Sequence, residues 1–219
     1  CVETILHTDM VHHFEMVKET QMLYQMNSDA SDEELVRLFR ERDTKGKLMN
    51  LFLHSADVSN PAKPWNLTKE WAKRCMREFF DQGDKEKEMG IPVQMLNDRS
   101  KVNKPFSQIG FVEYMIAPLE AAKTMLLPSL YETTRFLEHN IIQWSRLWVE
   151  ENNPPEEERE KVAGRVNRVC AMLTETRNSG PPFWTEVGIP RYPSMSSRSE
   201  ADDDRRSSTR RDSQYSTLM

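Results

Sequence analysis

Two side chains that could do chemistry, His54 and Asp57, lie three residues apart at the end of an apolar run. This spacing places them on one face of a helix, which must end soon afterwards because Pro61 excludes its predecessor from the helical conformation. An ionised carboxylate at the inner end of an apolar helix is costly unless a metal, a basic partner or hydrogen-bond donors neutralise it. A helix-end carboxylate that nearby backbone N–H groups satisfy remains the alternative. The segment is LMNLFLHSADVSNPAKPW, residues 48–65, in which Leu48, Met49, Leu51, Phe52 and Leu53 predict a buried helix.

A second pair, Gln108 and Phe111, also shares a helical face through its i,i+3 spacing. A glutamine amide donates and accepts hydrogen bonds together, as the edge of a purine requires, and a phenylalanine one turn away can stack on the purine ring. The pair is therefore a candidate base-binding site. A core phenylalanine beside a surface glutamine is the plainer interpretation of the same spacing.

Three histidines near the N-terminus do not form a metal motif. His7 is five residues from His12 and six from His13, whereas zinc-binding helices use an HxxxH spacing. We therefore expect surface or core-edge histidines here, with Asp9 among them.

The composition favours an all-α protein. The chain of 219 residues has only 7 Gly and is 30% charged, and it lacks the alternation and turn dipeptides of hairpins. The net charge of −5 does not indicate nucleic-acid binding. Cys1, Cys75 and Cys170 are odd in number and widely spaced, which indicates a reducing compartment, so we expect a cytoplasmic protein without a membrane span or signal peptide. Because the first residue is Cys in a helical pattern, we expect the chain to belong to something longer.

Apolar periodicity and end signals predict seven helices. Ser31 and Asn66 are predicted N-caps, Gly90 a helix end, and Pro118 a break or kink. Residues 91–105 form a long connection, which is often functional. The helices are expected at 2–26, 32–42, about 45–57, 67–89, from 107 onward, 130–151 and 155–177; from about 190 the Ser-, Arg- and Asp-rich chain reads as a disordered tail.

Four stretches occur together in one order: ILHTDMVHHF at 5–14, LHSADVSNPAKPW at 53–65, EFFDQGDKEKEMG at 78–90 and SQIGFVEYMIAPL at 107–119. Together they closely resemble the class I 3',5'-cyclic nucleotide phosphodiesterase catalytic domain, over roughly residues 1–150 and about the C-terminal half of that domain. The resemblance implies the family's all-helical fold. We thus expect this part of a phosphodiesterase domain at 1–150, an additional helix and loop at 151–189, and the tail at 190–219.

The resemblance also implies roles for single residues. In the family, Zn²⁺ and Mg²⁺ are held by two histidines and two aspartates, and the later aspartate corresponds to Asp57. Gln108 corresponds to the glutamine that reads the purine edge, and Phe111 to the aromatic clamp. Asn60 matches a position near the base that is Asn in cAMP-preferring members. His54 and Asp9 match motif positions to which we assign a supporting role, and Cys75 and Phe79 complete the expected base pocket, with Cys75 at the place of an aliphatic clamp partner.

One departure from the family pattern matters for activity. The family's Tyr-His-Asn-x-x-His signature and the His-Asp pair that follows it are absent from this sequence. These carry three of the four metal ligands, so they would lie upstream of Cys1. The expected function is hydrolysis of cyclic nucleotides, cAMP favoured, by a metal-activated hydroxide, with this chain supplying the purine pocket and one ligand; the alternative is an inactive helical binding or scaffold fragment.

The tail carries a possible partner site of a different kind. Ser208 and Ser213 each follow an Arg-Arg-x pattern, which basophilic kinases favour. A phosphate at either serine would add negative charge beside the arginines. The same pattern also arises easily in any tail rich in Ser and Arg.

Overall fold

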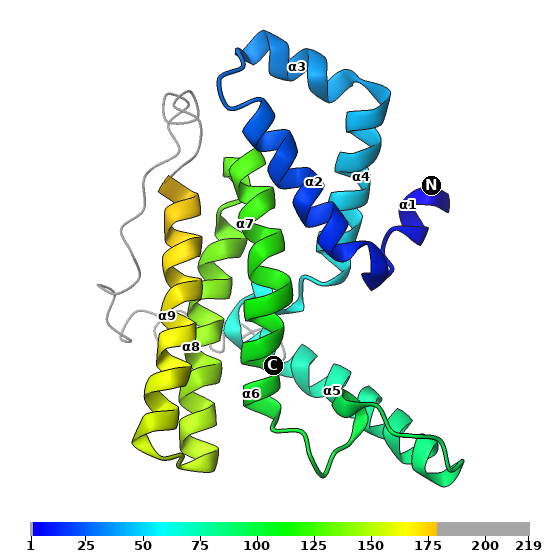
Figure 1. Ribbon diagram of the computed structural model, residues 1–219, viewed down its shortest axis with the longest axis vertical. Coiled ribbons are helices and arrows are strands. Elements are labelled where there is room, and N and C mark those ends of the chain that lie inside the picture. Colours follow the sequence, from blue (N-terminus) through cyan, green and yellow to red (C-terminus); the bar gives the residue numbers. More distant parts are fainter. Residues whose placement is uncertain (1, 179–219) are drawn as a thin grey trace, which may run out of the picture. The chain divides into compact units, whose positions relative to one another are not determined.

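The computed structural model describes residues 2–178, apart from the side chain of Asp32, and every regular element in that range is helical (Figure 1). No helix among these residues has the length and apolar character needed to cross a membrane. The longer elements are α1 (Val2–Leu6), α2 (His13–Met26), α3 (Asp32–Arg40), α4 (Arg42–Asp57), α5 (Trp65–Glu88), α6 (Lys104–Phe111), α7 (Ala117–Leu126), α8 (Glu132–Asn152) and α9 (Glu156–Asn178); the short ones are η1 (Met10–His12), η2 (Asn60–Ala62), η3 (Met95–Asn97), a π-helix η4 (Val112–Ile116) and η5 (Pro128–Leu130).

Local end signals account for two of the predicted boundaries. Ser31 caps α3 in a full capping box, in which its hydroxyl accepts from the Glu34 backbone N–H while the Glu34 carboxylate accepts from the Ser31 N–H. Gly90, with φ of +68°, ends α5, and Ile91 N–H donates to the Glu86 carbonyl at 2.9 Å. This is a Schellman ending, which requires the left-handed conformation that glycine adopts at little cost.

Three predicted helix ends are wrong. The helix expected at 2–26 is divided into α1, η1 and α2, and Asp9 caps η1 by accepting from Val11 N–H at 3.0 Å. Asn66 is not an N-cap, because α5 already begins at Trp65. The helix expected from Ser107 begins at Lys104, since the Asn103 side chain accepts from Phe106 N–H at 3.0 Å.

Pro118 does not break its helix. The chain stays helical from α6 through the π turn η4 into α7, so that residues 104–126 form one rod (Figure 1). A proline ring normally clashes with the carbonyl four residues earlier, which here belongs to Tyr114 inside η4. A π turn is wider than an α turn, and its place directly before Pro118 relieves this crowding.

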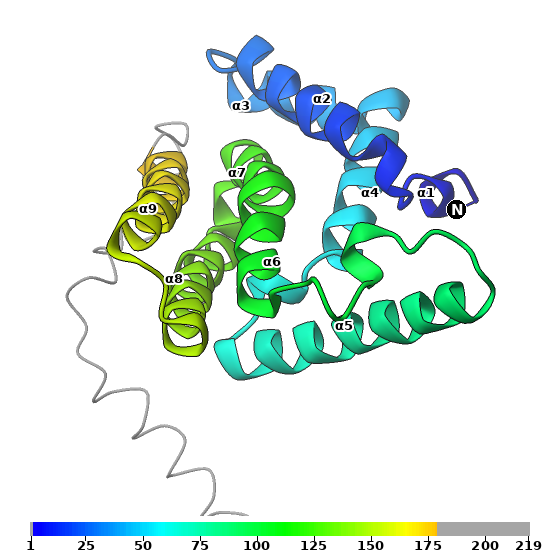
Figure 2. The same cartoon turned by 60° about the horizontal axis from the view of Figure 1, so that its bottom comes forward.

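The main core lies between this rod, α8 and α9, which run alongside one another in both ribbon views (Figures 1 and 2). Val162, Val166, Val169 and Leu173 project from α9 into it, so this helix shares the core of the elements before it. A second, smaller core joins α2, α4 and α7; its buried members are Met16, Val17, Leu51, Leu119 and Ala122.

The predicted burial of α4 is only half right. Leu51 is almost fully buried, but Phe52 is 43% exposed and Leu53 39%. Met49, one turn earlier, is also exposed. One side of α4 therefore packs into the smaller core while a second apolar side faces solvent.

Candidate functional site

The two buried histidines His13 and His54 form a chain that joins α2, α4 and the π turn. His13 Nδ1 lies 2.8 Å from His54 Nε2, and His13 Nε2 lies 3.1 Å from the Met115 carbonyl oxygen. Because a carbonyl only accepts, His13 Nε2 carries the proton and its Nδ1 accepts from His54. Burial, followed by the neighbouring His54, lowers the pKa of His13, and burial lowers the pKa of His54. These rings stay neutral near pH 7 and lock three helices together.

Asp57 lies one turn beyond His54, at the last position of α4, and is exposed. The expectation of a carboxylate at the inner end of a buried helix is therefore wrong, because solvent reaches this group and hydrates its charge. His54 and Asp57, three residues apart, therefore lie in different environments: His54 is buried and Asp57 is exposed. An exposed carboxylate at a helix end is free to bind a cation.

The residues present do not make a complete metal centre. Within residues 2–178 no cluster of three or more His, Cys, Asp or Glu side chains could hold an ion. The nitrogens of His13 and one nitrogen of His54 already bond to protein groups. Asp57 thus offers one oxygen ligand, and a catalytic zinc needs about three protein ligands.

Asn60 and Cys75, two predicted pocket residues, are brought together by the turn between α4 and α5. Asn60 Nδ2 lies 3.7 Å from Cys75 Sγ. Burial raises the pKa of the Cys75 thiol, and Glu78 adds to the effect, so the group is a small protonated side chain, not a nucleophile.

A buried asparagine that the sequence analysis missed holds this turn in place. Asn140 on α8, fully buried, donates from Nδ2 to the carbonyl oxygens of Pro61 and Lys63, each at 2.7 Å. The Thr68 hydroxyl donates to the Asn60 carbonyl at 2.9 Å. Buried polar groups must be paired, so an asparagine amid the apolar positions of α8 was the signal that could have revealed this contact.

Gln108 and Phe111 lie on α6 as their spacing predicts. Phe111 packs, partly buried, against the main core. Gln108 is half-buried, and its side-chain amide has no hydrogen-bond partner within residues 2–178. Phe79, on α5, is 43% exposed. The first turn of α6 meets α5 where the Ser107 hydroxyl lies 3.6 Å from Met76 Sδ.

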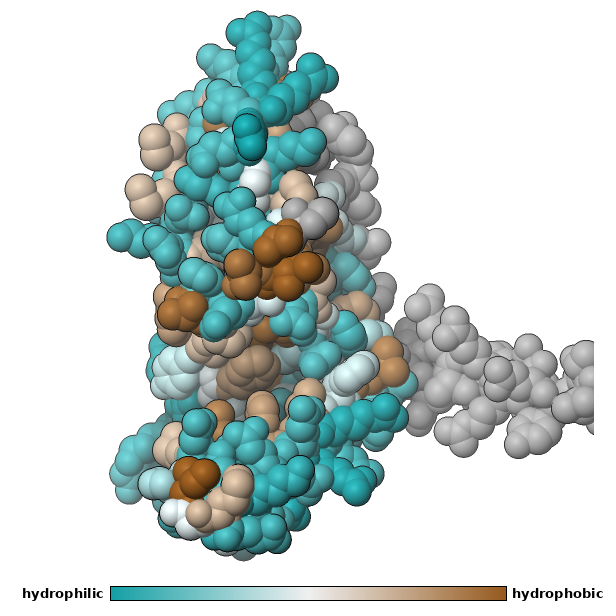
Figure 3. Space-filling view, turned by 90° about the vertical axis from the view of Figure 1, so that its right-hand side faces the viewer, coloured by the Kyte–Doolittle hydropathy of each residue, from teal (hydrophilic) through white to brown (hydrophobic). Residues whose placement is uncertain are grey.

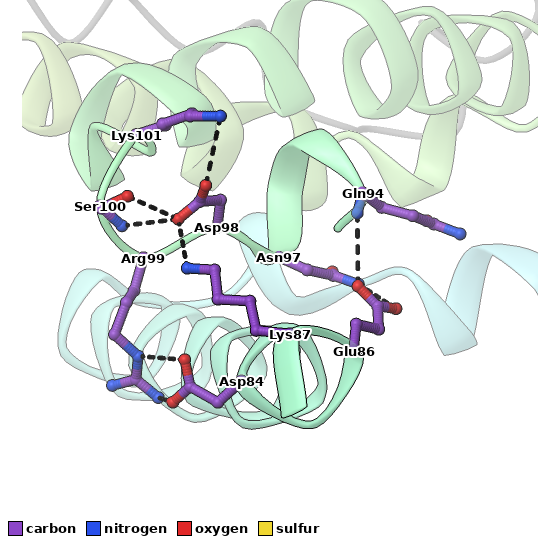
Figure 4. Close-up of polar contacts among 9 residues, drawn as sticks. All are labelled: Asp84, Glu86, Lys87, Gln94, Asn97, Asp98, Arg99, Ser100 and Lys101. Carbon is purple, nitrogen blue, oxygen red and sulfur yellow. Dashed lines mark hydrogen bonds and ion pairs between the residues drawn. The ribbon is translucent and has the colours of Figure 1, made fainter. Parts of the chain in front are cut away.

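Polar contacts fasten the connection between α5 and α6 onto α5, and we call this set the clasp; it comprises Asp84, Glu86, Lys87, Gln94, Asn97, Asp98, Arg99 and Ser100 (Figure 4). Glu86 accepts from Asn97 Nδ2 at 3.1 Å and from Gln94 N–H at 3.3 Å. Gly83 lies directly beneath, and a Cβ there would meet the Asn97 carbonyl oxygen at 2.1 Å. Only glycine permits this approach.

The other half of the clasp is ionic. Asp98, nearly buried, accepts from the Ser100 hydroxyl at 2.7 Å and from Lys87 Nζ at 2.9 Å, and these two contacts hold its pKa well below the usual range (Figure 4). Arg99 pairs with Asp84 and lies 5.5 Å above the ring of Phe80. The long connection, predicted as potentially functional, is thus fixed along α5.

The model of one protein family, described as 3'5'-cyclic nucleotide phosphodiesterase, matches residues 1–137. A Bos taurus protein named "Dual specificity calcium/calmodulin-dependent 3',5'-cyclic nucleotide phosphodiesterase 1B" is 39% identical over 117 residues, which are 53% of this chain and 20% of that protein. A Caenorhabditis elegans protein named "Probable 3',5'-cyclic-AMP phosphodiesterase pde-4" is 31% identical over 156 residues, 71% of this chain and 22% of its own length.

The solved structure of LmjPDEB1 in complex with IBMX superposes with a TM-score of 0.59 at 25% identity. The superposition covers 67% of this chain and 42% of that one. The chain therefore spans about a fifth of the curated relatives it matches and less than half of this solved relative.

Proposed function

The chain belongs to the 3'5'-cyclic nucleotide phosphodiesterase family, and from that premise we propose that it supplies the base pocket and one metal ligand for hydrolysis of 3',5'-cyclic nucleotides to 5'-nucleoside monophosphates. The family match over residues 1–137 is the observation that carries the proposal. We further propose that the protein acts in cyclic nucleotide signalling in the cytoplasm, where the free thiols of Cys75 and Cys170 would persist.

The proposed base pocket comprises Asn60, Cys75, Phe79, Gln108 and Phe111. Gln108 would pair with the purine edge, because its amide has no competing partner in the described range, and Phe111 would stack on the ring. Asn60, whose backbone Thr68 and Asn140 help to fix, would narrow the pocket beside Cys75. Preference for cAMP rests on Asn60 alone.

Asp57 is the proposed ligand for Zn²⁺, and Mg²⁺ is the proposed second ion of the same site. Its exposure at the end of α4 leaves it accessible to ions, whereas His13 and His54 are engaged with each other. His54 and Asp9 would play a supporting role: His54 would hold α4, which carries Asp57, and Asp9 would hold η1. When bound, divalent ions would supply a water whose pKa falls to about 7; the remaining ligands would come from residues outside this chain.

The test is a single polypeptide in which the catalytic-domain segment preceding the matched region of the bovine relative is joined to Cys1. We expect it to hydrolyse cyclic nucleotide with Zn²⁺ and Mg²⁺ present, and the Asp57→Ala form to lose about a thousandfold or more, since a metal contributes several kcal/mol to the barrier. Asp29→Ala, an exposed loop aspartate, is the control. Equal activity of both variants would refute the assignment of Asp57.

The alternative, a helical binding fragment without catalysis, is favoured by the single available metal ligand. Under the proposed function the isolated 219-residue chain still has no measurable activity. Robust turnover by that chain, abolished by Asp57→Ala, would contradict our account of the site. The proposed kinase sites Ser208 and Ser213, like the tail at 190–219, lie outside the described residues and stay predictions.

A further inference from the structure

Arg165 of α9 contacts both α6 and the π turn η4. Its Nε donates to a Glu113 carboxylate oxygen at 2.8 Å, and its Nη2 lies 2.6 Å from the same oxygen. The guanidinium carbon lies 5.1 Å from the ring centroid of Phe106 and 5.7 Å from that of Tyr114. We call these four residues the Arg165 cluster. Its ion pair joins residues 52 positions apart, so the cluster fastens α9 to a distant part of the chain.

The surroundings of the cluster make its ion pair stronger than one at an open surface. The side chain of Arg165 is 19% exposed and that of Glu113 is 12% exposed, so water and salt screen their charges only in part. A fully exposed pair contributes little to stability, whereas a desolvated charge that loses its partner is costly. A planar guanidinium donates to a carboxylate and stacks on aromatic rings at the same time. Removing Arg165 would therefore loosen α6 and η4 from α9.

The cluster lies on the side of α6 that faces away from Gln108. Phe106 and Gly110 are four residues apart and share one side of the helix, and a Cβ at Gly110 would lie 4.0 Å from Arg165 Nη2. Gln108 is two residues from each of them, which is about 200° around the helix at about 100° per residue. Arg165 therefore supports the back of the helix that carries the proposed base-binding side chains, and it does not enter the proposed pocket.

His13 holds the π turn from a second side. Its Nε2, on α2, donates to the Met115 carbonyl at 3.1 Å, whereas Arg165 contacts the preceding residues Glu113 and Tyr114. The family model matches residues 1–137, which include His13, but α9 begins only at Glu156. The helix α9 thus adds a support for η4 that the family match does not cover.

The cluster is separate from the exposed apolar side chains of α1 and α4. Figure 3 shows hydrophobic side chains clustered on the side of the molecule that carries α1, whereas α9 packs against the rod and α8 (Figure 1). The groups of the cluster contact one another, so they need no partner on the α1 side. They can be tested in the 219-residue chain and in the single polypeptide with an upstream segment joined to Cys1, which we call the joined polypeptide.

We propose that Arg165 is a positioning residue for the base pocket: it holds α6 and η4 so that Gln108 and Phe111 meet the purine ring of a cyclic nucleotide. This inference rests on the proposed function, and it adds a residue outside the family match to those that determine substrate affinity. Because Arg165 acts from behind the helix, its loss weakens base binding in the ground state and in the transition state alike. Such a change raises KM and leaves kcat nearly unaltered.

The experiment compares two arginines of α9 in the joined polypeptide. Arg165→Ala should raise KM for cAMP about fivefold or more while kcat changes less than about twofold, because misplaced binding groups lose affinity. Arg177→Ala is the matched control, since Arg177 pairs with Glu138 of α8 at 2.8 Å and these two side chains are 13% and 11% exposed. Its KM should change less than about twofold, as expected of a site with no shared partners. A KM for Arg165→Ala no higher than that of Arg177→Ala would overturn the proposal, as would a loss confined to kcat.

Further variants test whether Arg165 acts through Glu113. Glu113→Ala should also raise KM, and combining it with Arg165→Ala should raise KM little further, because the effects of residues in contact are not additive. Effects that multiply in the double variant would contradict this role of Glu113. Arg165→Lys keeps a cation beside Glu113 without the planar stack, so its KM should lie between those of the wild type and Arg165→Ala. If Arg165→Ala does not fold, a wild-type KM for Arg165→Lys overturns the proposal.

Two measurements follow the same variants without catalysis. Equilibrium dialysis of cAMP with the joined polypeptide, after a chelator has removed divalent ions, gives a Kd that should rise in Arg165→Ala and not in Arg177→Ala. In the 219-residue chain, amide hydrogen exchange in α6 and η4 should become about threefold faster or more in Arg165→Ala only. A wild-type joined polypeptide that binds cAMP without hydrolysing it counts against the proposed function alone. Unchanged Kd values and exchange rates in Arg165→Ala overturn this proposal alone.

Discussion

The clasp on α5 and the apolar face, by which we mean the exposed apolar side chains of α1, α2 and α4 such as Leu6, Phe14 and Phe52, are built in opposite ways. In the clasp, each charged side chain and the Asn97 amide meet a partner within the connection or on α5, and Phe80 is buried beneath Arg99. On the apolar face, side chains as large as Phe14 and Phe52 meet solvent. The difference separates a region that this chain finishes by itself, the connection that leads into α6, from one that it leaves open to solvent, the surface of α4 that ends at Asp57.

The largest expected effect is the difference in stability loss between two Phe→Ala substitutions, one in each region. Phe80 is 4% exposed, and Phe80→Ala should destabilise the chain by about 3–5 kcal/mol because it leaves a cavity. Phe52→Ala should cost less than about 2 kcal/mol, since much of that ring is already in water. Urea unfolding followed by circular dichroism measures both. Equal losses in the free energy of unfolding would mean that Phe52 is packed in solution, and the contrast between the two regions would not hold.

Two glycines give the next test. A Cβ at Gly83 would collide with the Asn97 carbonyl, so Gly83→Ala should destabilise by about 1–3 kcal/mol, as overpacking does. Gly46, inside α4, has nothing within 4 Å of its virtual Cβ. Gly46→Ala should therefore stabilise by about 0.5–1 kcal/mol through helix propensity. A neutral Gly83→Ala would show that the connection moves away from α5 at little cost.

Substrate binding tests the region that the clasp leads into, because Gln108 lies on α6. In the joined polypeptide, Gln108→Ala should raise KM about 5- to 100-fold, because base-edge groups left unpaired cost about 1–3 kcal/mol. Gln25→Ala, an exposed glutamine of α2, is the control. Initial-rate measurements over a range of cAMP concentrations provide the values. An unchanged KM would remove Gln108 from the base pocket.

The smallest expected effect is a pH dependence in the clasp. The Ser100 hydrogen bonds and Lys87 depress the folded-state pKa of Asp98, so its contribution is present above the pKa of the unfolded chain and is lost as pH falls through the folded-state value. The wild type should lose stability between pH 5 and pH 2 more steeply than Asp98→Asn. Urea midpoints at several pH values measure the two slopes, and parallel slopes would exclude this role for Asp98.

Local signals made much of the fold predictable. The all-α class follows from composition, and the ends of α3 and α5 follow from Ser31 and Gly90, because caps act through neighbouring backbone groups. Pro118 was expected to break or kink its helix, but the helix continues through a π turn that accommodates the proline and has no sequence signature of its own. Asn66 was expected to be the N-cap of α5, but the helix begins one residue earlier, at Trp65 directly after Pro64.

The candidate site was less accessible to sequence reasoning. Periodicity identified α4 as apolar, but it cannot distinguish a side covered within this chain from one left open. The exposure of Asp57 depends on that distinction. The contact between Asn140 and Pro61 joins residues 79 positions apart, and no local spacing predicts it.

The π turn at Val112–Ile116 also determines how the side chains before it are rotated about the rod axis relative to the side chains after it. It amounts to one residue inserted into an α-helical rod, and each residue advances an α-helix by about 100°. Gln108 and Phe111 stand before the insertion, whereas Ala121 and Ala122 of the two cores stand after it. Deleting one residue of the turn would rotate Gln108 and Phe111, the proposed base-binding side chains, by about a quarter of a revolution about the rod axis while α7 stayed packed in the two cores. The length of this five-residue segment therefore determines the direction in which these two side chains face.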